Sequence, residues 1–324
     1  MHQLTFSRTV PRELVHRSSV AEVFVTSLVE HGGQIEVGVQ LPRSHAFFGD
    51  TDHGHHDPLA FTEAARQACL AVAHQCFDVP AEARFVLRGF ELRVLDPAGI
   101  AIGDTPCDAV LHCHVVRRFT RDSRLHGLQL RHRAEIGGRH VLTADFAFSW
   151  LPENEWAAIR GTIEPAPAAR PQPRCAASVV GRACARNVVI GPPHVEGSFA
   201  RAAVVVDTSH PTLFDHALDH TPGMVLVEAS RQLATACASV SANLSAGLVT
   251  GLRCRFTEFT ELGAETTCHC QLGSVQPAGA GREVHAWCWL NQSGRSVAEA
   301  QLRLSFPDTA VAGPHVDCQA ERTC

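Results

Sequence analysis

The chain has 324 residues, a formal net charge of -5 at pH 7 and 19% charged residues. This length exceeds the roughly 100–200 residues usual for one domain, so two domains are expected. The weakly acidic balance provides no basic surface for nucleic acid. The sequence also lacks a run of about 18 apolar residues and the pattern of a signal peptide. We therefore expect a cytoplasmic protein that binds neither nucleic acid nor membrane.

Thirteen cysteines are present, but their number is odd and no Cys-x-x-Cys pair occurs. We expect reduced, buried thiols rather than disulfides. Cys268 and Cys270 share one face of a predicted strand, yet two ligands do not make a metal site. The 28 basic residues are all arginines, and this excludes Schiff-base catalysis through a lysine. A bound phosphate or carboxylate would have to be held by arginine.

The first predicted domain, residues 1–160, has a short strand, then a loop, then a long helix. The loop at 45–57, HAFFGDTDHGHHD, is rich in His and Asp, but the spacing is irregular, so we expect an exposed loop and no metal site. Asp57 can cap a helix that has Pro58 at its first position and continues to residue 76. Four alternating apolar runs then predict strands at 85–95, 108–119, 127–136 and 140–150.

The proline-rich segment 161–178 predicts a linker, and 307–324 predicts a flexible tail. Between them, residues 179–306 repeat the order of the first domain. Thr221 is the predicted cap and Pro222 the first residue of a second apolar helix that continues to residue 240. Predicted strands follow at 251–259, 266–275, 283–290 and 296–306.

The two domains are an internal repeat with an offset of 165 residues. Matching positions include Ser44 and Ser209, His45 and His210, Asp50 and Asp215, and the Glu-x-x-Arg-Gln strings that start at Glu63 and Glu228. One helix followed by a meander of strands is typical of the hotdog fold, an antiparallel sheet wrapped around a central helix. We therefore predict an α+β protein of two tandem hotdog domains that form a pseudo-dimer by pairing sheet edges.

Several strings resemble a known family. Pro222-Gly223 followed by Glu228 resembles the helix start of hotdog acyl-carrier-protein dehydratases. More closely, VPRELVHRSSVAEVFVTS, LPRSHAFF and DPLAFTEAARQA resemble the A-factor biosynthesis (AfsA-type) family, which has two hotdog repeats. The resemblance implies an acyltransferase that moves a β-ketoacyl group from acyl carrier protein onto dihydroxyacetone phosphate, without a cofactor. The product would be a butenolide phosphate, a precursor of a γ-butyrolactone-type or furan signal.

The predicted site lies on one face of each helix, because residues at i, i+3 and i+4 are neighbours. Each face would line an acyl-thioester cleft between the domains. Burial would raise the pKa of the catalytic carboxylates Glu63 and Glu228 toward neutrality, so that each can take a proton from a substrate hydroxyl. Arg66 or Arg231 would bind the acceptor phosphate, and backbone amides near Asp57 and Gly223 would polarise the thioester. The neighbouring substrate-binding candidates are Gln67 and Gln232.

Other candidates come from single motifs. His216 lies twelve residues before Glu228, near where dehydratases place a catalytic histidine, whereas the first domain has Thr51 at the matching position. This difference points to the second domain as the better equipped one. His45 and His210 are substrate-binding candidates, although a turn histidine that bonds the backbone explains them equally well.

The sequence leaves several alternatives open. Arg43 would contact phosphopantetheine or the acceptor phosphate, or is an exposed arginine without a role. Each Glu-Arg pair could instead be a structural ion pair. The protein could also be a hotdog dehydratase or thioesterase, or a non-catalytic regulator that binds an acyl chain or lactone. A homodimer is compatible with each of these functions.

Overall fold

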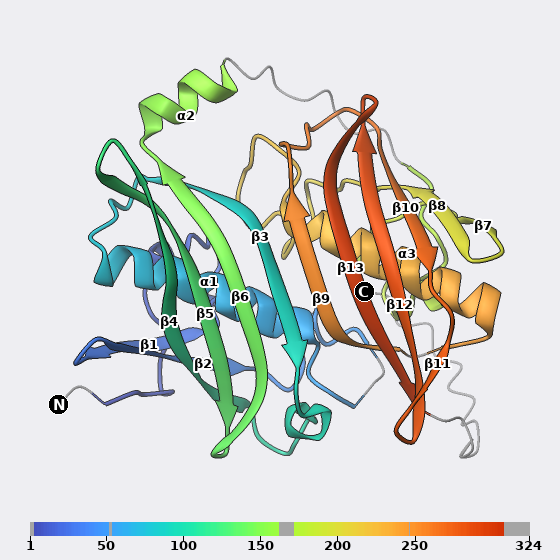
Figure 1. Cartoon of the computed structure of the whole chain (residues 1–324), viewed down its shortest axis with the longest axis horizontal. Coiled ribbons are helices and arrows are strands. Elements are labelled where there is room, and N and C mark those ends of the chain that lie inside the picture. The colour runs from blue at the N-terminus through green and yellow to red at the C-terminus, as the bar shows by residue number, and fades with distance from the viewer. Residues whose placement is uncertain (1–2, 52–53, 162–171, 246, 308–324) are drawn as a thin grey trace.

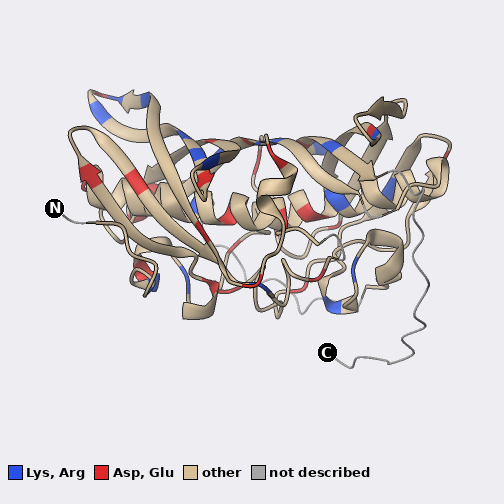
Figure 2. Ribbon diagram, turned by 90° about the horizontal axis from the view of Figure 1, so that it is seen from below, with Lys and Arg blue, Asp and Glu red and all other residues tan. Residues whose placement is uncertain are grey.

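The computed structural model describes residues 3–51, 54–161, 172–245 and 247–307. Within these residues the strands form one 13-stranded antiparallel sheet, and two long helices lie against one of its faces (Figure 1). Figure 2 shows the helices in a middle layer, with the sheet on one side and loops on the other. The chain is therefore two tandem hotdog domains that share one sheet, as the sequence predicted.

The first domain contains a strand hairpin, a long helix and four further strands. Its elements are η1 Arg12–Val15, η2 Val20–Glu22, β1 Val25–His31, β2 Gln34–Leu41, α1 Pro58–Cys76, β3 Arg84–Val94, η3 Pro97–Ile100, β4 Cys107–Arg121, β5 Arg124–Ile136, β6 Arg139–Leu151 and α2 Glu153–Arg160.

The second domain repeats this order with shorter leading strands. Its elements are η4 Ala177–Val180, η5 Ala185–Asn187, β7 His194–Glu196, β8 Phe199–Ala203, α3 Gly223–Ala242, β9 Leu248–Phe256, β10 Thr266–Leu272, β11 Gln276–Ala278, β12 Gly281–Gln292 and β13 Arg295–Pro307.

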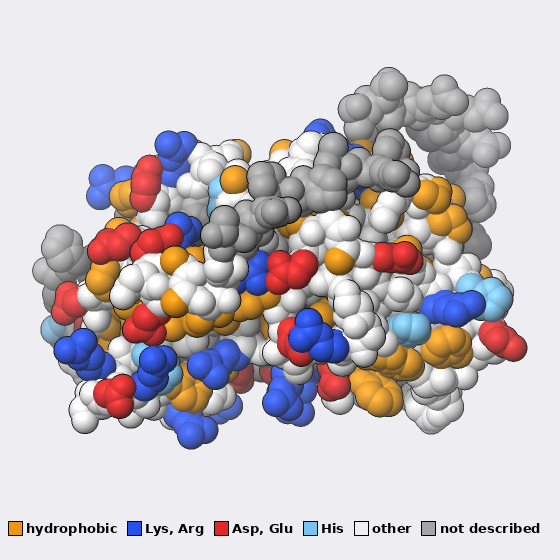
Figure 3. Space-filling model, turned by 90° about the horizontal axis from the view of Figure 1, so that it is seen from above, with side chains coloured by type: hydrophobic (Ala, Val, Ile, Leu, Met, Phe, Trp, Pro, Cys, Tyr) orange, Lys and Arg blue, Asp and Glu red, His pale blue; other side chains and the backbone are white. Residues whose placement is uncertain are grey.

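The long strands alternate in burial because one face of the sheet covers the helices and the other is open to solvent. Along β10, for example, every second residue is buried, including Cys268 and Cys270. Their thiols belong to the core of the second domain. Side chains of both charge signs are interspersed on the face seen in Figure 3.

The helices differ at their first residues. Asp57 caps α1 by accepting the backbone N–H of Leu59, with Pro58 at the first position, as predicted. The expectation that Thr221 caps the second helix is wrong. Pro222 itself occupies the N-cap position of α3, no side chain caps that end, and the helix starts at Gly223. The α3 amides at this end are therefore available for another acceptor.

The domains join edge to edge where β3 pairs with β9, from Gly89 opposite Arg255 to Arg93 opposite Gly251. The strand order is β1-β2-β4-β5-β6-β3-β9-β13-β12-β10-β8-β7, with β11 paired to β12. This confirms the predicted pairing of sheet edges. Because the β3–β9 register starts only at Gly89, residues 84–88 pair with β6 at most and not with β9, which leaves room for a cavity between the domains.

The structure adds features that the sequence did not predict. The hairpins β1–β2 and β7–β8 replace the single short strand expected before each helix, and α2 was not predicted. The loop at 45–57 was expected to be exposed, but Phe47, Phe48, His56 and Asp57 are buried. Most of the predicted linker and tail, at 162–171 and 308–324, lies outside the described residues. Among the helices described, none has the length and apolar character needed to span a membrane.

We expect the Gly89→Ala substitution to weaken the junction between the domains. A Cβ at position 89 would lie 2.6 Å from the backbone oxygen of Cys254, so β3 or β9 would have to shift. The expected loss is about 1–3 kcal/mol in the free energy of unfolding, measured by urea denaturation. Gly103→Ala is the control because its Cβ would meet nothing within 4 Å. Equal stability of the two variants would contradict this account.

Candidate active site between the two domains

Glu63, on α1, is buried within a network of cationic and amide groups. Its carboxylate accepts hydrogen bonds from Arg66 at 2.8 and 2.9 Å, from Arg17 Nε at 3.1 Å and from the Gln67 amide at 2.8 Å. Arg17 also donates through a second guanidinium nitrogen. Glu63 has 2% of its side chain exposed, Arg17 has 9% and Arg66 has 23%, so solvent reaches this network mainly through Arg66.

Glu228, on α3, has the matching network. It accepts from Arg231 at 2.8 and 2.9 Å, from Arg182 at 2.8 and 3.1 Å, and from the Gln232 amide. Arg231 donates in addition to the carboxylate of Asp57 at 3.2 Å. Arg182 and Glu228 are both almost completely buried. This network has the properties of the structural ion pair considered above.

The sequence analysis missed Arg17 and Arg182, the second arginine of each network. A signal for them was present, because Arg17 and Arg182 are separated by the same 165 residues as the other repeat matches. They lie before the hairpins, in segments without apolar periodicity, and so outside the helix faces that the repeated Glu-x-x-Arg-Gln strings define.

The structure corrects the expected ionisation of the two glutamates. Burial alone would raise the pKa of Glu63, as we expected, but Arg17 and Arg66 outweigh it and the net pKa lies below the ordinary value. The same balance, with Arg182 and Arg231, lowers the pKa of Glu228. Both groups are carboxylates at neutral pH with their oxygens already occupied, so neither is suited to be a general base.

Gln67 and Gln232 hold the chain segments that precede the hairpins. The Gln67 amide accepts from the N–H of Phe24 at 2.8 Å and donates to the carbonyl of Glu22 at 2.7 Å. Gln232 makes the same pair of bonds with Val189 and Asn187. Both side chains are fully buried.

Two aspartates fasten each domain to the other. Asp215 accepts the N–H groups of Ser18 and Ser19 at 2.6 and 3.0 Å. In the matching contact, Asp50 accepts those of Ala183 and Cys184 at 3.1 and 3.0 Å. The loop that contains Asp215 is therefore held next to Arg17 in the first domain.

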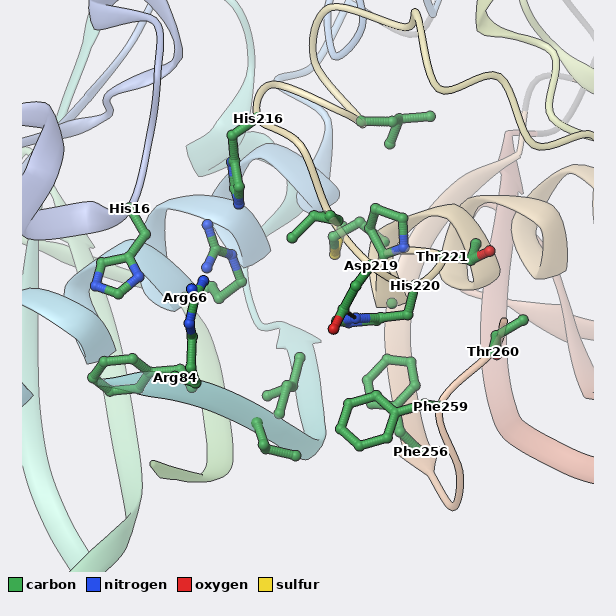
Figure 4. Close-up of a pocket in the computed structure, with 18 of the residues that line it drawn as sticks. His16, Arg66, Arg84, His216, Asp219, His220, Thr221, Phe256, Phe259 and Thr260 are labelled. Atoms are coloured by element: carbon green, nitrogen blue, oxygen red, sulfur yellow. Dashed lines mark hydrogen bonds and ion pairs between the residues drawn. The ribbon is translucent and has the colours of Figure 1, made fainter. Parts of the chain in front are cut away.

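A cavity of about 1100 Å³ lies between α1 and the loop that leads into α3. Figure 4 shows His16, Arg66, Arg84 and His216 around one part of it and Asp219, His220, Thr221, Phe256, Phe259 and Thr260 around another. Glu63, Arg17, Gly223 and Met224 also line it. The cavity thus combines the Glu63 network of the first domain with the uncapped start of α3 from the second.

The described residues that line the cavity do not include Glu228, Arg231 or Gln232 of the second network. Gln67 of the first network does not line it either. The difference arises at matching positions 57 and 222. Asp57 pairs with Arg231 and closes the site at the start of α1, whereas Pro222 has no side-chain acceptor for Arg66. Arg66 therefore keeps an exposed edge in the cavity.

Positions 47 and 212 reinforce this difference. Phe47 lies two residues after His45, and Thr212 lies two residues after His210. In each case the backbone N–H donates to Nδ1 of that histidine, at 3.1 Å for Phe47 and 3.2 Å for Thr212. The Phe47 ring lies 4.4 Å from the Arg182 guanidinium and fills the space beside it. Thr212 is smaller and lines the open cavity instead. The larger side chain thus occupies the second site, and the smaller one leaves the first open.

His216 lies in the cavity with the Glu63 network, not with Glu228. Its Nδ1 is 3.5 Å from Asp215, and its side chain is 36% exposed. Burial, and next the charge of Arg17, lower the pKa of His216. The sequence spacing predicted that His216 lies beside Glu228 in the second domain. Instead, the loop that contains His216 folds onto the first domain and places this histidine near Arg17.

His45, His210 and Arg43 do not line the cavity. The Nδ1 atoms of both histidines accept backbone N–H groups of their own turns. His45 Nε2 lies 3.4 Å from Glu22, and His210 Nε2 lies 3.1 Å from Asn187. Arg43 is exposed. These geometries match the turn-histidine and surface-arginine alternatives named above.

A second group missed by the sequence analysis surrounds His220. Its Nδ1 lies 2.5 Å from Asp219, and the rings of Phe259 and Trp156 lie 5.0 and 6.1 Å from it. Arg160, at the end of α2, binds Asp219 at 3.3 Å. His220 matches His55 in the repeat, but its neighbours Phe259, Trp156 and Arg160 come from other segments and cannot be placed from spacing.

We expect Arg182→Met to destabilise the protein by about 3–5 kcal/mol, because it leaves the buried Glu228 carboxylate with one cation fewer. Arg17→Met is the matched control. The loss there should be smaller, since solvent in the cavity reaches the Glu63 network. Urea unfolding at pH 7 measures both, and a larger loss in Arg17→Met would contradict the difference in burial.

The chain should also lose stability in acid. The folded pKa values of Glu63 and Glu228 lie below the ordinary value of 4.5. Their contribution is therefore complete above that pH and is lost as the pH falls through the folded values. Urea midpoints between pH 7 and pH 3 should decline for the wild type and decline less for Glu228→Gln.

Comparison with known proteins agrees with the fold and the repeat. Residues 2–152 and 164–308 each match the A-factor biosynthesis hotdog domain. The chain is 34% identical over 258 residues to a protein of Streptomyces virginiae named 2-oxo-3-(phosphooxy)propyl 3-oxoalkanoate synthase, covering 78% of this chain and 84% of that one. A Streptomyces griseus protein of the same name is 31% identical over 279 residues, covering 83% and 86%.

Solved structures resemble it in fold alone. A candidate thioesterase of Novosphingobium aromaticivorans superposes with a TM-score of 0.51 at 16% identity, covering 87% of this chain and 98% of that one. A tesB protein of Mycobacterium avium subspecies paratuberculosis gives 0.50 at 14%, covering 87% and 96%. With both repeats matched and relatives above 30% identity over most of its length, the chain belongs to the A-factor biosynthesis hotdog family.

Proposed function

We propose that this protein is an acyltransferase that joins a β-ketoacyl group from acyl carrier protein to the hydroxyl of dihydroxyacetone phosphate. The name of its relatives describes the ester of these two parts, a 2-oxo-3-(phosphooxy)propyl 3-oxoalkanoate. The observation that carries the proposal is the cavity in which Arg66, His216 and the uncapped start of α3 meet. The ester can close to the butenolide phosphate expected from the sequence.

The start of α3 is suited to polarise the thioester carbonyl. Gly223 and Met224 line the cavity, no side chain caps their end of the helix, and the helix dipole adds positive potential there. A Cβ at position 223 would lie 2.7 Å from the Phe256 ring, so a larger residue there would force this ring to shift. The equivalent end of α1 is already occupied by Asp57 and Arg231.

Arg66 is suited to bind the acceptor phosphate. Its Nε and Nη2 donate to Glu63, which fixes the guanidinium plane, and its remaining edge faces the cavity. Arg84 lines the same part of the cavity (Figure 4). Glu63 therefore acts as a positioning residue that orients Arg66 and Arg17 and holds both at the site.

Of the three catalytic candidates predicted from the sequence, Glu63 and His216 line the cavity and Glu228 does not. With its pKa lowered His216 is neutral at pH 7, and a neutral imidazole can donate a hydrogen bond to an oxygen that becomes negative. In this proposal His216 joins the α3 amides in stabilising the tetrahedral oxyanion. Arg231, Gln232, Gln67, His45, His210 and Arg43 remain sequence candidates that do not line the cavity.

The two duplicated networks allow a matched test. Purified protein is incubated with a β-ketoacyl carrier protein and dihydroxyacetone phosphate, and the phosphorylated adduct is quantified by mass spectrometry. Arg66→Ala should lower adduct formation by about 100-fold or more, since it removes the phosphate contact. Glu63→Gln should lower it as well, because Arg66 loses its ionic partner.

The controls are Glu228→Gln and Arg231→Ala, which alter the buried network. Among variants that stay folded by circular dichroism, these two should keep near-wild-type turnover. Loss of activity only in the second pair would place the site at Glu228 instead. Thioester hydrolysis or dehydration without a triose adduct would favour the dehydratase or thioesterase alternative, and tight binding without turnover would favour the regulator.

A second test uses the difference between positions 47 and 212. Thr212→Phe should place a ring beside Arg17, as Phe47 does beside Arg182, and fill the cavity. We expect the KM for the acceptor to rise at least about tenfold in protein that still folds, because the matching position accepts a phenylalanine, although the hydrogen bond from the Thr212 hydroxyl to Glu22 is lost. Steady-state kinetics with Thr212→Ser as control measures this. An unchanged KM would show that the cavity next to Thr212 is not used.

A further inference from the structure

The cavity contains a histidine with a carboxylate partner, to which the proposed function has so far given no role. His220 Nδ1 lies 2.5 Å from Asp219 Oδ1. Both residues line the cavity, and Figure 4 shows them on the side opposite Arg66 and His16. His220 is 21% exposed on its side chain, so a small molecule can reach the ring from the cavity.

Asp219 is held in place on both sides of its carboxylate. Oδ1 meets His220, and Oδ2 accepts from Arg160 Nε at 3.3 Å. Arg160 also donates to the carbonyl of Asp219 at 3.1 Å and to Glu261 at 2.7 and 2.8 Å. Burial alone would raise the pKa of Asp219, but its bonds with His220 and Arg160 lower it, so it is a carboxylate at neutral pH.

This carboxylate determines which nitrogen of His220 has the proton. An ionised Asp219 can only accept, so His220 Nδ1 must donate, and in the neutral ring the lone pair is then on Nε2. The ring also packs in a cluster with Phe259 and Trp156, whose own rings lie 5.3 Å apart, and the backbone of His220 pairs with Glu261 in a β-bridge. Nε2 is therefore the nitrogen with which His220, a residue that lines the cavity, can accept a proton.

The surroundings distinguish His220 from His216 as a base. A base becomes an imidazolium when it takes a proton, and an adjacent carboxylate stabilises that charge. His220 has such a partner at 2.5 Å. His216 lies near the cations Arg17 and Arg66, and its closest carboxylate, Asp215, is 3.5 Å away and already accepts two N–H groups. His16 bonds His74 at 3.0 Å and is occupied.

We propose that Asp219 and His220 form a general-base dyad that activates the acceptor hydroxyl, an inference that rests on the proposed function. His220 Nε2 removes the hydroxyl proton as the oxygen attacks the thioester carbonyl carbon. When the tetrahedral intermediate collapses, the C–S bond breaks and the imidazolium returns that proton to the leaving thiolate. The products are an ester and a free thiol, so no other reactant is required.

The test compares kcat and KM for His220→Ala, His220→Gln and Asp219→Asn. His220→Ala should lower kcat by about 100-fold or more with little change in KM. Added imidazole should restore at least a tenth of the lost rate, a rescue that a merely structural histidine would not give. Asp219→Asn should lower kcat without rescue by imidazole, because the histidine is still present and only its orientation is affected.

The matched control is His285→Gln, which removes a histidine paired with Glu283 at 3.1 Å on the exposed sheet surface. It should leave kcat unchanged. A folded His220→Gln variant with wild-type kcat, or no imidazole rescue of a folded His220→Ala variant, would overturn the dyad.

Failure of the dyad and failure of the proposed function give different results. A wild type that forms the triose adduct while the His220 variants keep its kcat removes the dyad alone. If the wild type only hydrolyses the thioester, dihydroxyacetone phosphate is not the acceptor. The dyad is then tested with the same variants on the hydrolysis reaction, in which water is the nucleophile. A wild type that leaves the thioester intact overturns both.

Discussion

A buried glutamate held between two arginines is the interaction on which both domains depend. A carboxylate without partners would be too costly to bury in a helix that packs against a sheet, and each of these has two cations and a glutamine amide around it. Arg17 and Arg182 come from the segments before the hairpins, so the network fixes those segments to α1 and α3. The backbone N–H groups of Ser18 and Ser19, next to Arg17, then donate to the carboxylate of Asp215 in the other domain. These contacts together fix the loop of the second domain against α1 and so determine where the cavity lies.

The same network is retained twice while its surroundings have diverged. At the second network Asp57 adds a carboxylate and Phe47 a ring, and together they seal Arg231 and Arg182 from solvent. At the first, Pro222 and Thr212 occupy the matching positions, and Arg66 faces a cavity. An ion network whose edge is closed can only stabilise the fold, whereas one with an exposed guanidinium edge can also bind an anion. The differences at these two pairs of positions therefore contribute to the two outcomes.

The sequence was sufficient for the fold because the repeat and the strand alternation are local patterns. The helix from Pro58 to Cys76 and its Asp57 cap followed from composition and spacing. The contacts between the domains could not be predicted in this way. His216 was assigned to Glu228 by its distance along the chain, yet the Asp215 bonds carry its loop to Arg17. The sign of the Glu63 pKa shift was also missed, because it depends on Arg17, whose partner lies 46 residues away. Sequence spacing shows which residues share a helix face but not which segment packs against that face.

Joining the domains in one chain permits a site that a dimer of identical chains could not have. In a symmetric dimer, a residue at position 57 would appear on both sides, so a carboxylate that closes one site would close the other. Here Asp57 and Pro222 differ, and α2 contributes Trp156 and Arg160 at the open site, where Arg160 holds Asp219 against His220. The arginines of the first domain and the dyad of the second then lie on different sides of one cavity (Figure 4). In the proposed mechanism, the anion would bind on one side of the cavity and the proton would be accepted on the other, so the cation that binds the phosphate would not suppress the charge that forms on the base.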